Sequence, residues 1–489
     1  MSVPTRSSEP GNNVIPPHAG GTPTASAAEL IAALRAAVGA EYVAVDPDVT
    51  AAYARDMMPL APFGVPLAVV KPGSTAEVAA VVRACAAAGV PIVPRGAGSG
   101  LTGASNAVDG AVSVVMTRMN RILEIDEGNR LAVVQPGVVN KDLRTAVEAR
   151  GLFYAPDPSS YDWCSIGANL PTNAGGLCCV TYGVTTDAVL GLEVVLASGE
   201  VLRTGRRTVK GVAGYDLTKL IVGSEGTLGI ITEATLSLRP KPQAPVTMVA
   251  AFEKVGAAGD AVTSAIAAGL VPSLLEIMDA ASIRAVEAHT GAKILGDGPT
   301  PAAILIGQSD LGGEPALVEM ERMQGCCDAA GAVFSYVTAD LAEARMLLQA
   351  RRDVLPSLEE LGTWVTDDVC VPRTAIAALI TACEDISADT GILISVVGHA
   401  GDGNMHPTMV YRDDSGADAA RRAHDAYDRV LDAARALGGT ITGEHGVGRM
   451  KQAHLAGEIG PVGLSAHRAI KRALDPAGLF NPGSMFSME

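Results

Sequence analysis

The chain has few basic residues, no long apolar run and no cysteine pair with the spacing of a metal or redox site. Its 37 Lys and Arg residues against 53 Asp and Glu residues give a formal net charge of −16. This charge argues against a nucleic-acid-binding surface and, more weakly, against direct attachment to anionic lipid. No apolar run reaches the roughly 18 residues that indicate a membrane-spanning helix. The eight cysteines include two adjacent pairs but no C-x-x-C, so we expect reduced thiols in a cytoplasmic protein, with any membrane contact peripheral.

The 489 residues are 48% hydrophobic and 18% charged, a composition typical of a globular protein with two or three domains. Residues 1–24 are rich in Pro, Gly, Ser and Thr, which predicts a disordered tail. Because the chain is so acidic, an anionic substrate must be captured by a few local Arg or Lys residues or by a metal.

A glycine-rich loop follows the first predicted strand–helix–strand unit. Strands are expected over 66–72 and 90–94, with a helix between them that begins after Ser74 and stops at Gly89. The next segment contains G-x-G-x-x-G, but it continues into a strand over 111–117 and opens no helix, so a Rossmann dinucleotide site is not expected. Its backbone N–H groups still suit a pyrophosphate; the alternative is a tight connection between strands.

Further glycine-rich segments follow along the first half of the chain. A turn-rich passage covers 156–176, a hairpin is expected over 190–202, and a helix, a glycine loop and a strand are expected over 214–231. Several glycine loops at strand ends suggest one extended nucleotide ligand.

A second α+β unit is expected beyond the Pro-containing segment 239–242. Strands over 247–252, 274–278, 302–308, 332–337, 364–371, 392–397 and 405–411 alternate with helical stretches, which favours an antiparallel sheet with helices on one face. Helices over 417–437 and 463–474 precede the C-terminus.

Three of the eight histidines fall in two short segments, GHAGDGNMH at 398–406 and GEHG at 443–446. Two strands joined by the 400–404 turn would place His399 and His406 side by side at one end of a sheet. Glu444 would complete a two-His, one-carboxylate set, the ligand count of a metal site with open positions. The alternative is that these residues lie in ordinary surface turns.

The chain resembles the FAD-dependent D-2-hydroxy-acid dehydrogenases of the vanillyl-alcohol-oxidase flavoprotein superfamily, the group of D-lactate dehydrogenase, the glycolate oxidase catalytic subunit and D-2-hydroxyglutarate dehydrogenase. The resemblance extends from about residue 66 to 483. Its motifs are PRGAGSGLTG at 94–103, TNAGG at 172–176, GSEGTLGI at 223–230, the two histidine segments and LFNPG at 479–483.

The resemblance implies an α+β chain in four parts: a tail (1–24), a two-part FAD-binding domain (25–242), an antiparallel-sheet substrate or cap domain (243–430) and a helical C-terminal segment that completes the active site (431–489). It also implies FAD, bound non-covalently because Ser99 stands where relatives with covalent FAD carry a histidine. The implied FAD-binding residues are Arg95, Gly96, Ala97, Gly98, Ser99, Gly100, Thr102, Gly103, Pro158, Ser159, Ser160, Ile166, Gly167, Asn169, Thr172, Asn173, Gly175, Gly176, Glu225, Gly226, Gly229, Ile230, Ile231 and Asn481.

By the same resemblance His399, His406 and Glu444 match the ligands of a divalent metal, usually zinc, with manganese or iron also suited to them. His445 matches the catalytic histidine, Arg351 the arginine that binds the substrate carboxylate, and Asn404 a substrate contact. Members specific for D-2-hydroxyglutarate carry a lysine at the position aligned with Thr366, so the sequence favours a short acid such as D-lactate or glycolate.

Three functional alternatives remain open at this stage: a D-2-hydroxyglutarate dehydrogenase, a flavin-free metallohydrolase and a catalytically silent flavoprotein subunit. A quinone, a cytochrome, an electron-transfer flavoprotein or a partner subunit would each serve as electron acceptor, and a homodimer is compatible with the sequence.

Overall fold

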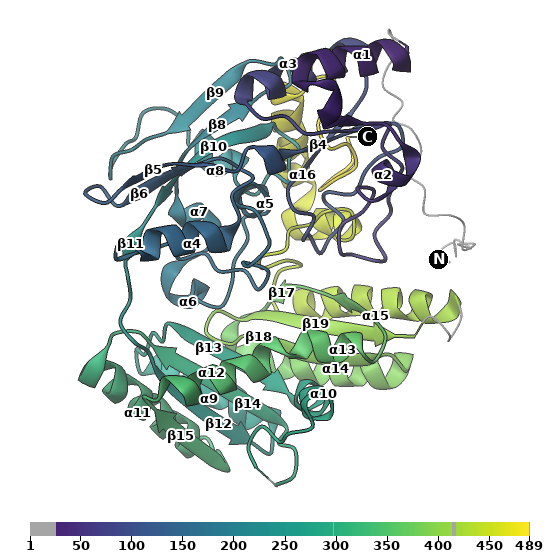
Figure 1. Ribbon diagram of the computed structural model, residues 1–489. Helices are drawn as coiled ribbons and strands as arrows, with labels where there is room; N and C mark the ends of the chain where they lie inside the picture. The colour runs from purple at the N-terminus through teal and green to yellow at the C-terminus, as the bar shows by residue number, and fades with distance from the viewer. Residues whose placement is uncertain (1–25, 297, 413–416, 489) are drawn as a thin grey trace.

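The computed structural model describes residues 26–296, 298–412 and 417–488, which form two lobes (Figure 1). The tail expected over 1–24 lies outside the described residues. No helix in the described part of the chain is both long and apolar enough to cross a bilayer. The C-terminal segment starts beside the lower lobe and runs into the upper one, so both lobes contain residues from the end of the chain (Figure 1).

The first part of the upper lobe is a four-stranded sheet in the order β1-β2-β4-β3, in which β2, β4 and β3 run parallel. Helix α3 connects β2 to β3. It begins where the Ser74 hydroxyl accepts a hydrogen bond from the N–H of Glu77, and it ends at Gly89 in the left-handed region, as the sequence predicts. The elements are α1 (Ala27–Val38), η1 (Ala40–Tyr42), β1 (Val43–Ala44), α2 (Pro47–Ala51), β2 (Ala68–Val70), α3 (Thr75–Ala88), β3 (Ile92–Arg95), β4 (Val112–Val115) and η2 (Met116–Arg118).

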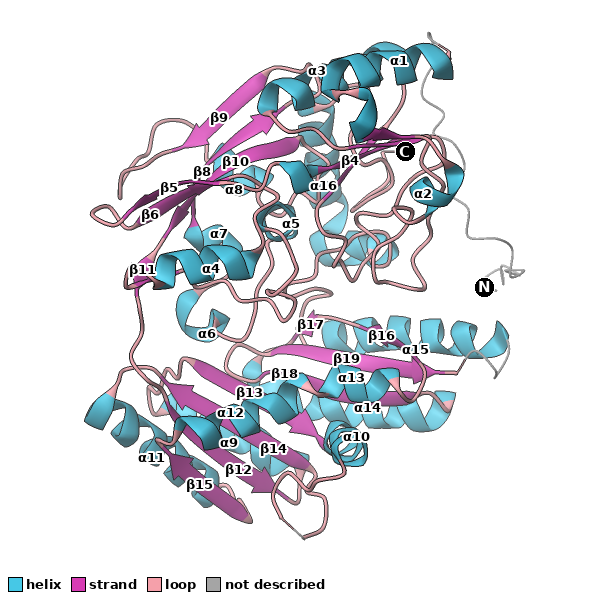
Figure 2. Cartoon of the chain, in the orientation of Figure 1, coloured by secondary structure: helices cyan, strands magenta, loops and turns pink. Residues whose placement is uncertain are grey.

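The second part of the upper lobe is an antiparallel sheet in the order β5-β6-β10-β8-β9, with β7 and β11 paired beside it (Figure 2). The hairpin predicted over 190–202 is β8–β9. The strands are β5 (Ile122–Asp126), β6 (Leu131–Val134), β7 (Leu152–Phe153), β8 (Val189–Val195), β9 (Val201–Gly205), β10 (Ile230–Ser237) and β11 (Arg239–Pro240). The helices are α4 (Asn140–Glu148), α5 (Ile166–Thr172), α6 (Cys179–Tyr182), α7 (Thr185–Ala188) and α8 (Leu217–Ile221).

Helix α5 lies inside the passage that the sequence describes only as turn-rich. Because Gly167 and Pro171 are poor helix formers, residue propensities alone do not predict this helix. Burial of Ile166 and Leu170 in the core of this lobe stabilises it, and Asn173 ends it in the left-handed conformation.

The lower lobe is an antiparallel sheet of eight strands. The order is β15-β12-β14-β13-β18-β19-β16, with β17 also paired to β19. These strands are β12 (Val246–Phe252), β13 (Leu274–Asp279), β14 (Ala303–Ser309), β15 (Phe334–Thr338), β16 (Thr363–Thr366), β17 (Val369–Cys370), β18 (Leu393–His399) and β19 (Asn404–Tyr411). The α+β class and the antiparallel cap sheet are thus confirmed. The strand predicted over 364–371 is interrupted at Asp367 and Asp368, whose side chains are fully buried.

The expectation of helices on one face of this sheet is wrong, because both faces are covered. Met248 and Phe252 of β12 pack in the core formed with α9, α11, α14 and α15, whereas Val249 and Ala251 pack with α10 and α13. A strand buried on both faces is apolar at consecutive positions, and β12 shows this pattern throughout. The helices of the lobe are α9 (Val255–Ala267), α10 (Ala280–Thr290), α11 (Gly313–Ala329), α12 (Leu341–Arg352), α13 (Val354–Glu359), η3 (Arg373–Ala375), α14 (Ile376–Thr390) and α15 (Ala417–Ala436).

The last helix, α16 (Gln452–Leu474), is longer than the stretch 463–474 predicted from the sequence, and it breaks at Gly460 and Pro461. After it, the chain returns to the first sheet: the N–H of Ile92 donates to the carbonyl of Leu479, and the N–H of Asn481 donates to the carbonyl of Ile92, each at 2.8 Å. These bonds attach the C-terminus to the strand that precedes the glycine-rich loop.

Candidate active site

One cavity lies between the lobes and takes its walls from both. The predicted residues that line it from the upper lobe are Arg95, Gly96, Gly98, Ser99, Gly100, Pro158, Ser159, Ser160, Gly167, Asn169, Thr172, Gly175, Glu225, Gly226, Gly229, Ile230 and Ile231. Arg351 and His406 of the lower lobe line the same cavity, as do Glu444 and His445 of the C-terminal segment. Residues spread over more than 350 positions of sequence therefore meet around one space.

The glycine-rich loop exposes backbone where side chains would otherwise stand. Gly98 has φ of +86°, and a Cβ there would lie 2.3 Å from the guanidinium of Arg95. At Gly175, a Cβ would lie 2.3 Å from the carboxylate of Glu444. The N–H groups of Gly98, Ser99 and Gly100 donate no hydrogen bond to another residue in the described ranges. Such a run of free backbone donors fits the pyrophosphate of a dinucleotide.

The remaining predicted FAD-binding residues lie outside the cavity lining: Ala97, Thr102, Gly103, Ile166, Asn173, Gly176 and Asn481. Two of them instead hold the C-terminal segment. The carbonyl of Thr102 accepts from the N–H groups of Arg449 (2.9 Å) and Met450 (3.2 Å), and the amide of Asn481 donates to the carbonyls of Ala104 and Glu225. Their direct contact with FAD stays a prediction.

Glu225 lines the cavity, yet its carboxylate is directed to the C-terminal segment. It accepts hydrogen bonds from the N–H groups of Val447 (2.7 Å) and Gly448 (2.9 Å) and from the hydroxyl of Ser484 (3.0 Å). Burial raises the pKa of this carboxyl, and the backbone donors oppose that effect. Glu225 therefore links a predicted FAD loop to the segment that follows His445.

The β18–β19 hairpin brings the predicted metal ligands together. The Nε2 atoms of His399 and His406 are 3.3 Å apart, and the Glu444 carboxylate lies 3.5 Å from the first and 3.2 Å from the second. Three donors around a cation with bonds of about 2.1 Å lie roughly 3.0–3.4 Å from one another. The geometry of His399, His406 and Glu444 thus fits a divalent metal ion.

His406 and Glu444 contribute to the cavity wall, whereas His399 lies behind it and is 3% exposed. Burial would raise the pKa of Glu444, but the two imidazoles outweigh it and hold this pKa well below its usual range. Glu444 is therefore a carboxylate at neutral pH, as a metal ligand must be.

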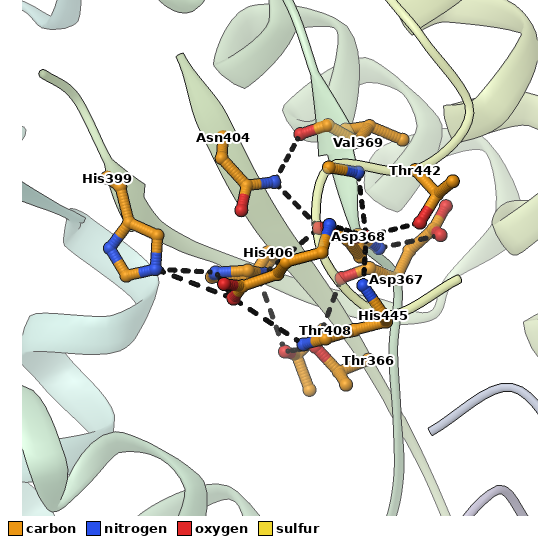
Figure 3. Close-up of polar contacts among 12 residues, drawn as sticks. Thr366, Asp367, Asp368, Val369, His399, Asn404, His406, Thr408, Thr442 and His445 are labelled. Atoms are coloured by element: carbon orange, nitrogen blue, oxygen red, sulfur yellow. Dashed lines mark hydrogen bonds and ion pairs between the residues drawn. The ribbon is translucent and has the colours of Figure 1, made fainter. Parts of the chain in front are cut away.

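Asp368, which the sequence interpretation overlooked, fixes the loop that carries Glu444 and His445 (Figure 3). One of its oxygens accepts from the hydroxyl of Thr442 (2.7 Å) and from the N–H groups of Gly443, Glu444 and His445 (2.8 Å each). Burial alone would raise its pKa, but the facing basic side chains, Lys451 among them, hold it well below its usual range. A permanent anion therefore orients three consecutive peptide groups.

Asn404, predicted to contact the substrate, is engaged by the same carboxylate. Its amide donates to Asp368 at 2.6 Å and to the carbonyl of Val369 at 3.1 Å (Figure 3). Asn404 does not belong to the cavity lining. Only its amide oxygen is free of these contacts, so a substrate contact stays a prediction.

Glu276 is a second carboxylate that the sequence interpretation missed. It accepts from Nε of Arg351 at 2.9 Å and faces Nδ1 of His399 at 2.5 Å. Burial raises its pKa, but His399 and Arg351 outweigh that effect and leave the pKa lowered. The available sequence signal was a charged residue flanked on both sides by apolar residues within strand β13.

His445, the predicted base, stacks on His406 with ring centroids 5.2 Å apart and an interplanar angle of 17°. Burial lowers its pKa, while the carboxylate of Asp368 acts in the opposite direction. An imidazole with a lowered pKa is neutral at neutral pH and can accept a proton.

Comparison with known proteins matches two families along the chain: the FAD binding domain over residues 66–205, and the C-terminal domain of FAD linked oxidases over residues 241–485. Among curated relatives, the glycolate oxidase subunit GlcD of Bacillus subtilis is 44% identical over 87% of this chain and 90% of its own. The D-lactate dehydrogenase of Anaerostipes hadrus is 33% identical over 92% and 95%.

Solved structures support the fold. p-Cresol methylhydroxylase superposes with a TM-score of 0.77 at 20% identity, covering 94% of this chain and 97% of its own. The 4-ethylphenol oxidase of Gulosibacter chungangensis gives 0.76 at 23% identity with the same coverage.

Glycine loops that can hold FAD share one cavity with side chains suited to a hydroxy acid, and the relatives are hydroxy-acid oxidases and dehydrogenases. The flavin-free metallohydrolase interpretation is thereby excluded. The chain belongs to the FAD-linked oxidases of the vanillyl-alcohol-oxidase flavoprotein superfamily, in the group of glycolate oxidase subunits and D-lactate dehydrogenases, and it is an FAD-dependent enzyme that oxidises hydroxy acids.

Proposed function

We propose that this enzyme oxidises a small D-2-hydroxy acid, D-lactate or glycolate, to the 2-oxo acid. The observation that carries the proposal is the shared cavity, which the glycine loops of the upper lobe line together with Arg351, His406, Glu444 and His445. When bound, FAD supplies the hydride acceptor and a divalent cation, zinc or alternatively manganese or iron, supplies a Lewis acid at the hydroxyl oxygen.

The side chains of the chain divide the remaining work. His399, His406 and Glu444 would hold the cation. Arg351 reaches the cavity with Nε already bonded to Glu276, which leaves its two terminal nitrogens for the substrate carboxylate. Neutral His445 would take the hydroxyl proton as Cα gives up its hydride.

The cavity wall favours a monocarboxylic acid. Among its described lining residues, the only Lys or Arg side chains are Arg95 and Arg351. Arg95 is occupied, since its guanidinium donates to the carbonyls of Arg55 and Ser105. At the position aligned with the lysine of D-2-hydroxyglutarate dehydrogenases, Thr366 offers only a hydroxyl, which accepts a hydrogen bond from the hydroxyl of Thr408 at 3.0 Å. No free cation in the described lining would therefore meet a second carboxylate, as D-2-hydroxyglutarate would require.

The proposal includes non-covalent FAD, since the loop carries Ser99 at its centre. The histidines of the described lining are His406, a proposed metal ligand, and His445, the proposed base. It also includes an electron acceptor outside this chain. The relatives from Bacillus subtilis and Escherichia coli are named subunits of glycolate oxidase, which supports a partner subunit over a free quinone, cytochrome or electron-transfer flavoprotein. We place the protein in the cytoplasm or at a membrane surface through that partner.

The test is an anaerobic titration of the purified, metal-loaded holoenzyme with D-lactate, L-lactate, glycolate and D-2-hydroxyglutarate, following the flavin absorption band. We expect bleaching by D-lactate or glycolate at the lowest concentration. Preferential bleaching by D-2-hydroxyglutarate would contradict the proposed substrate class, and no bleaching by any of the four would contradict the activity itself and leave a catalytically silent subunit.

A further inference from the structure

We propose that Glu276 is a positioning residue that links the two substrate anchors, the metal site and Arg351, into one rigid unit. The inference rests on the proposed function, because it assumes that the substrate carboxylate binds Arg351 while its hydroxyl meets the metal.

The two oxygens of Glu276 have separate partners. One faces Nδ1 of His399 at 2.5 Å, and the other accepts from Nε of Arg351 at 2.9 Å. Its side chain is completely buried, and the side chains of His399 and Arg351 are 3% and 9% exposed. In such dry surroundings neither partner can exchange this carboxylate for water without a large cost.

The backbone determines this arrangement. Glu276 of β13 and His399 of β18 are direct cross-strand partners in the centre of the cap sheet. Their side chains therefore point to the same face of the sheet. Arg351 comes from the last turn of α12. Glu276, fixed by its position in the sheet, thus holds the side chain of Arg351 from helix α12.

The contact also selects a tautomer. When Nδ1–H of His399 donates to Glu276, the lone pair of Nε2 is directed at His406 and Glu444, which is the form a metal ligand needs. On Arg351 the same carboxylate occupies Nε and sets the plane of the guanidinium. Loss of Glu276 should therefore weaken metal binding and substrate carboxylate binding together.

A purely structural ion pair would behave differently, and the chain contains a matched example. Glu193 in β8 of the upper lobe is also buried, and it accepts from Nε of Arg203 at 3.0 Å. It lines no part of the cavity. Because the Arg203 side chain is 79% exposed, Glu193→Gln reports what the loss of a buried carboxylate does when its arginine partner lies at the surface and away from the cavity.

The experiment compares wild type, Glu276→Gln and Glu193→Gln as FAD-loaded proteins. Zinc and manganese affinities are measured by competition with a chelator, and KM and kcat are measured at saturating metal. For Glu276→Gln we expect metal affinity to fall about 10- to 100-fold and KM for glycolate or D-lactate to rise at least tenfold, with the FAD content unchanged. Glu193→Gln should leave metal affinity and KM within twofold of wild type.

A second arm uses Arg351→Lys alone and combined with Glu276→Gln. If Glu276 acts through Arg351, the double variant should have the KM of Arg351→Lys, while its metal affinity should still fall. Unchanged metal affinity and KM in Glu276→Gln, or equal losses in Glu193→Gln, would overturn the inference. Failure of the wild type to oxidise any hydroxy acid would instead overturn the proposed function, and the metal-affinity arm would still decide the role of Glu276 on His399.

Discussion

The two ends of the cavity are built from different parts of the polypeptide. At the FAD end, which the glycine loops of the upper lobe line, the chain presents mainly backbone, since a Cβ at Gly96 or Gly98 would lie less than 3 Å from a neighbouring side chain. At the metal end it presents charged side chains, each held by a buried carboxylate: Glu276 holds His399 and Arg351, and Asp368 holds the loop of Glu444 and His445. The two ends should therefore fail independently, one losing the cofactor and the other losing the chemistry while the flavin stays bound.

The largest effect should come from the metal end. His399→Ala removes one of the three proposed metal ligands. We expect metal content to fall below one-tenth of wild type and turnover to fall by about three orders of magnitude, because transition-state charge loses its stabilisation. Flavin content should stay at the wild-type ratio, as measured by absorbance. Metal content equal to that of wild type would refute the ligand role, and loss of flavin as well would show that the two ends are coupled.

The FAD end can be broken by Gly98→Ala. The added Cβ would lie 2.3 Å from the guanidinium of Arg95, and φ of +86° adds backbone strain. We expect the dissociation constant of FAD to rise at least tenfold, as measured by flavin retention on dilution, while the affinity for zinc stays unchanged.

Gly110→Ala is the matched control for that variant. Gly110 has φ of +73°, but a Cβ there meets no atom within 4 Å. It should lose only the stability that a left-handed alanine costs, about 1–2 kcal/mol, and retain FAD. Equal flavin loss in both variants would mean that backbone strain, and not contact in the loop, controls FAD binding.

A smaller effect should distinguish substrates. Glu359 at the end of α13 lines the cavity with an exposed carboxylate, which repels a second substrate carboxylate. Glu359→Gln should lower KM for D-2-hydroxyglutarate about two- to fivefold, the size of one screened charge interaction, and leave KM for D-lactate unchanged. Glu360→Gln is the control, because that carboxylate faces His289 at 2.9 Å and not the cavity. An equal change for both substrates would contradict this specificity role.

The same contrast explains what could be predicted from the sequence. Glycine loops at strand ends, and two histidines flanking a tight turn, are local patterns, and the structure gathers them as expected. The partners of Glu276 and Asp368 are close in space but far along the sequence. Glu276 lies opposite His399, 123 residues later, because their strands pair in the sheet, and Asp368 accepts from peptide groups more than 70 residues downstream. No local pattern specifies such partners.

The missed helix and the misassigned sheet face have a similar origin. Tertiary burial overrides the poor propensity of Gly167 and Pro171 in α5. The second layer of helices covers the apolar residues on the other face of β12. A continuous apolar run in the sequence is compatible with a buried strand or a buried helix, so it does not by itself predict that both faces of a sheet are covered.

Oxidation of the hydroxy acid requires a base at its hydroxyl group, the role proposed for His445. The direct measurement is rapid anaerobic mixing of His445→Ala, loaded with FAD and metal, with D-lactate or glycolate. We predict that the rate of flavin reduction by substrate falls about 10²- to 10⁴-fold, as expected for loss of a general base, while dithionite still reduces the flavin fully. Reduction of the variant by substrate at the wild-type rate would contradict the proposed role of His445 as the base.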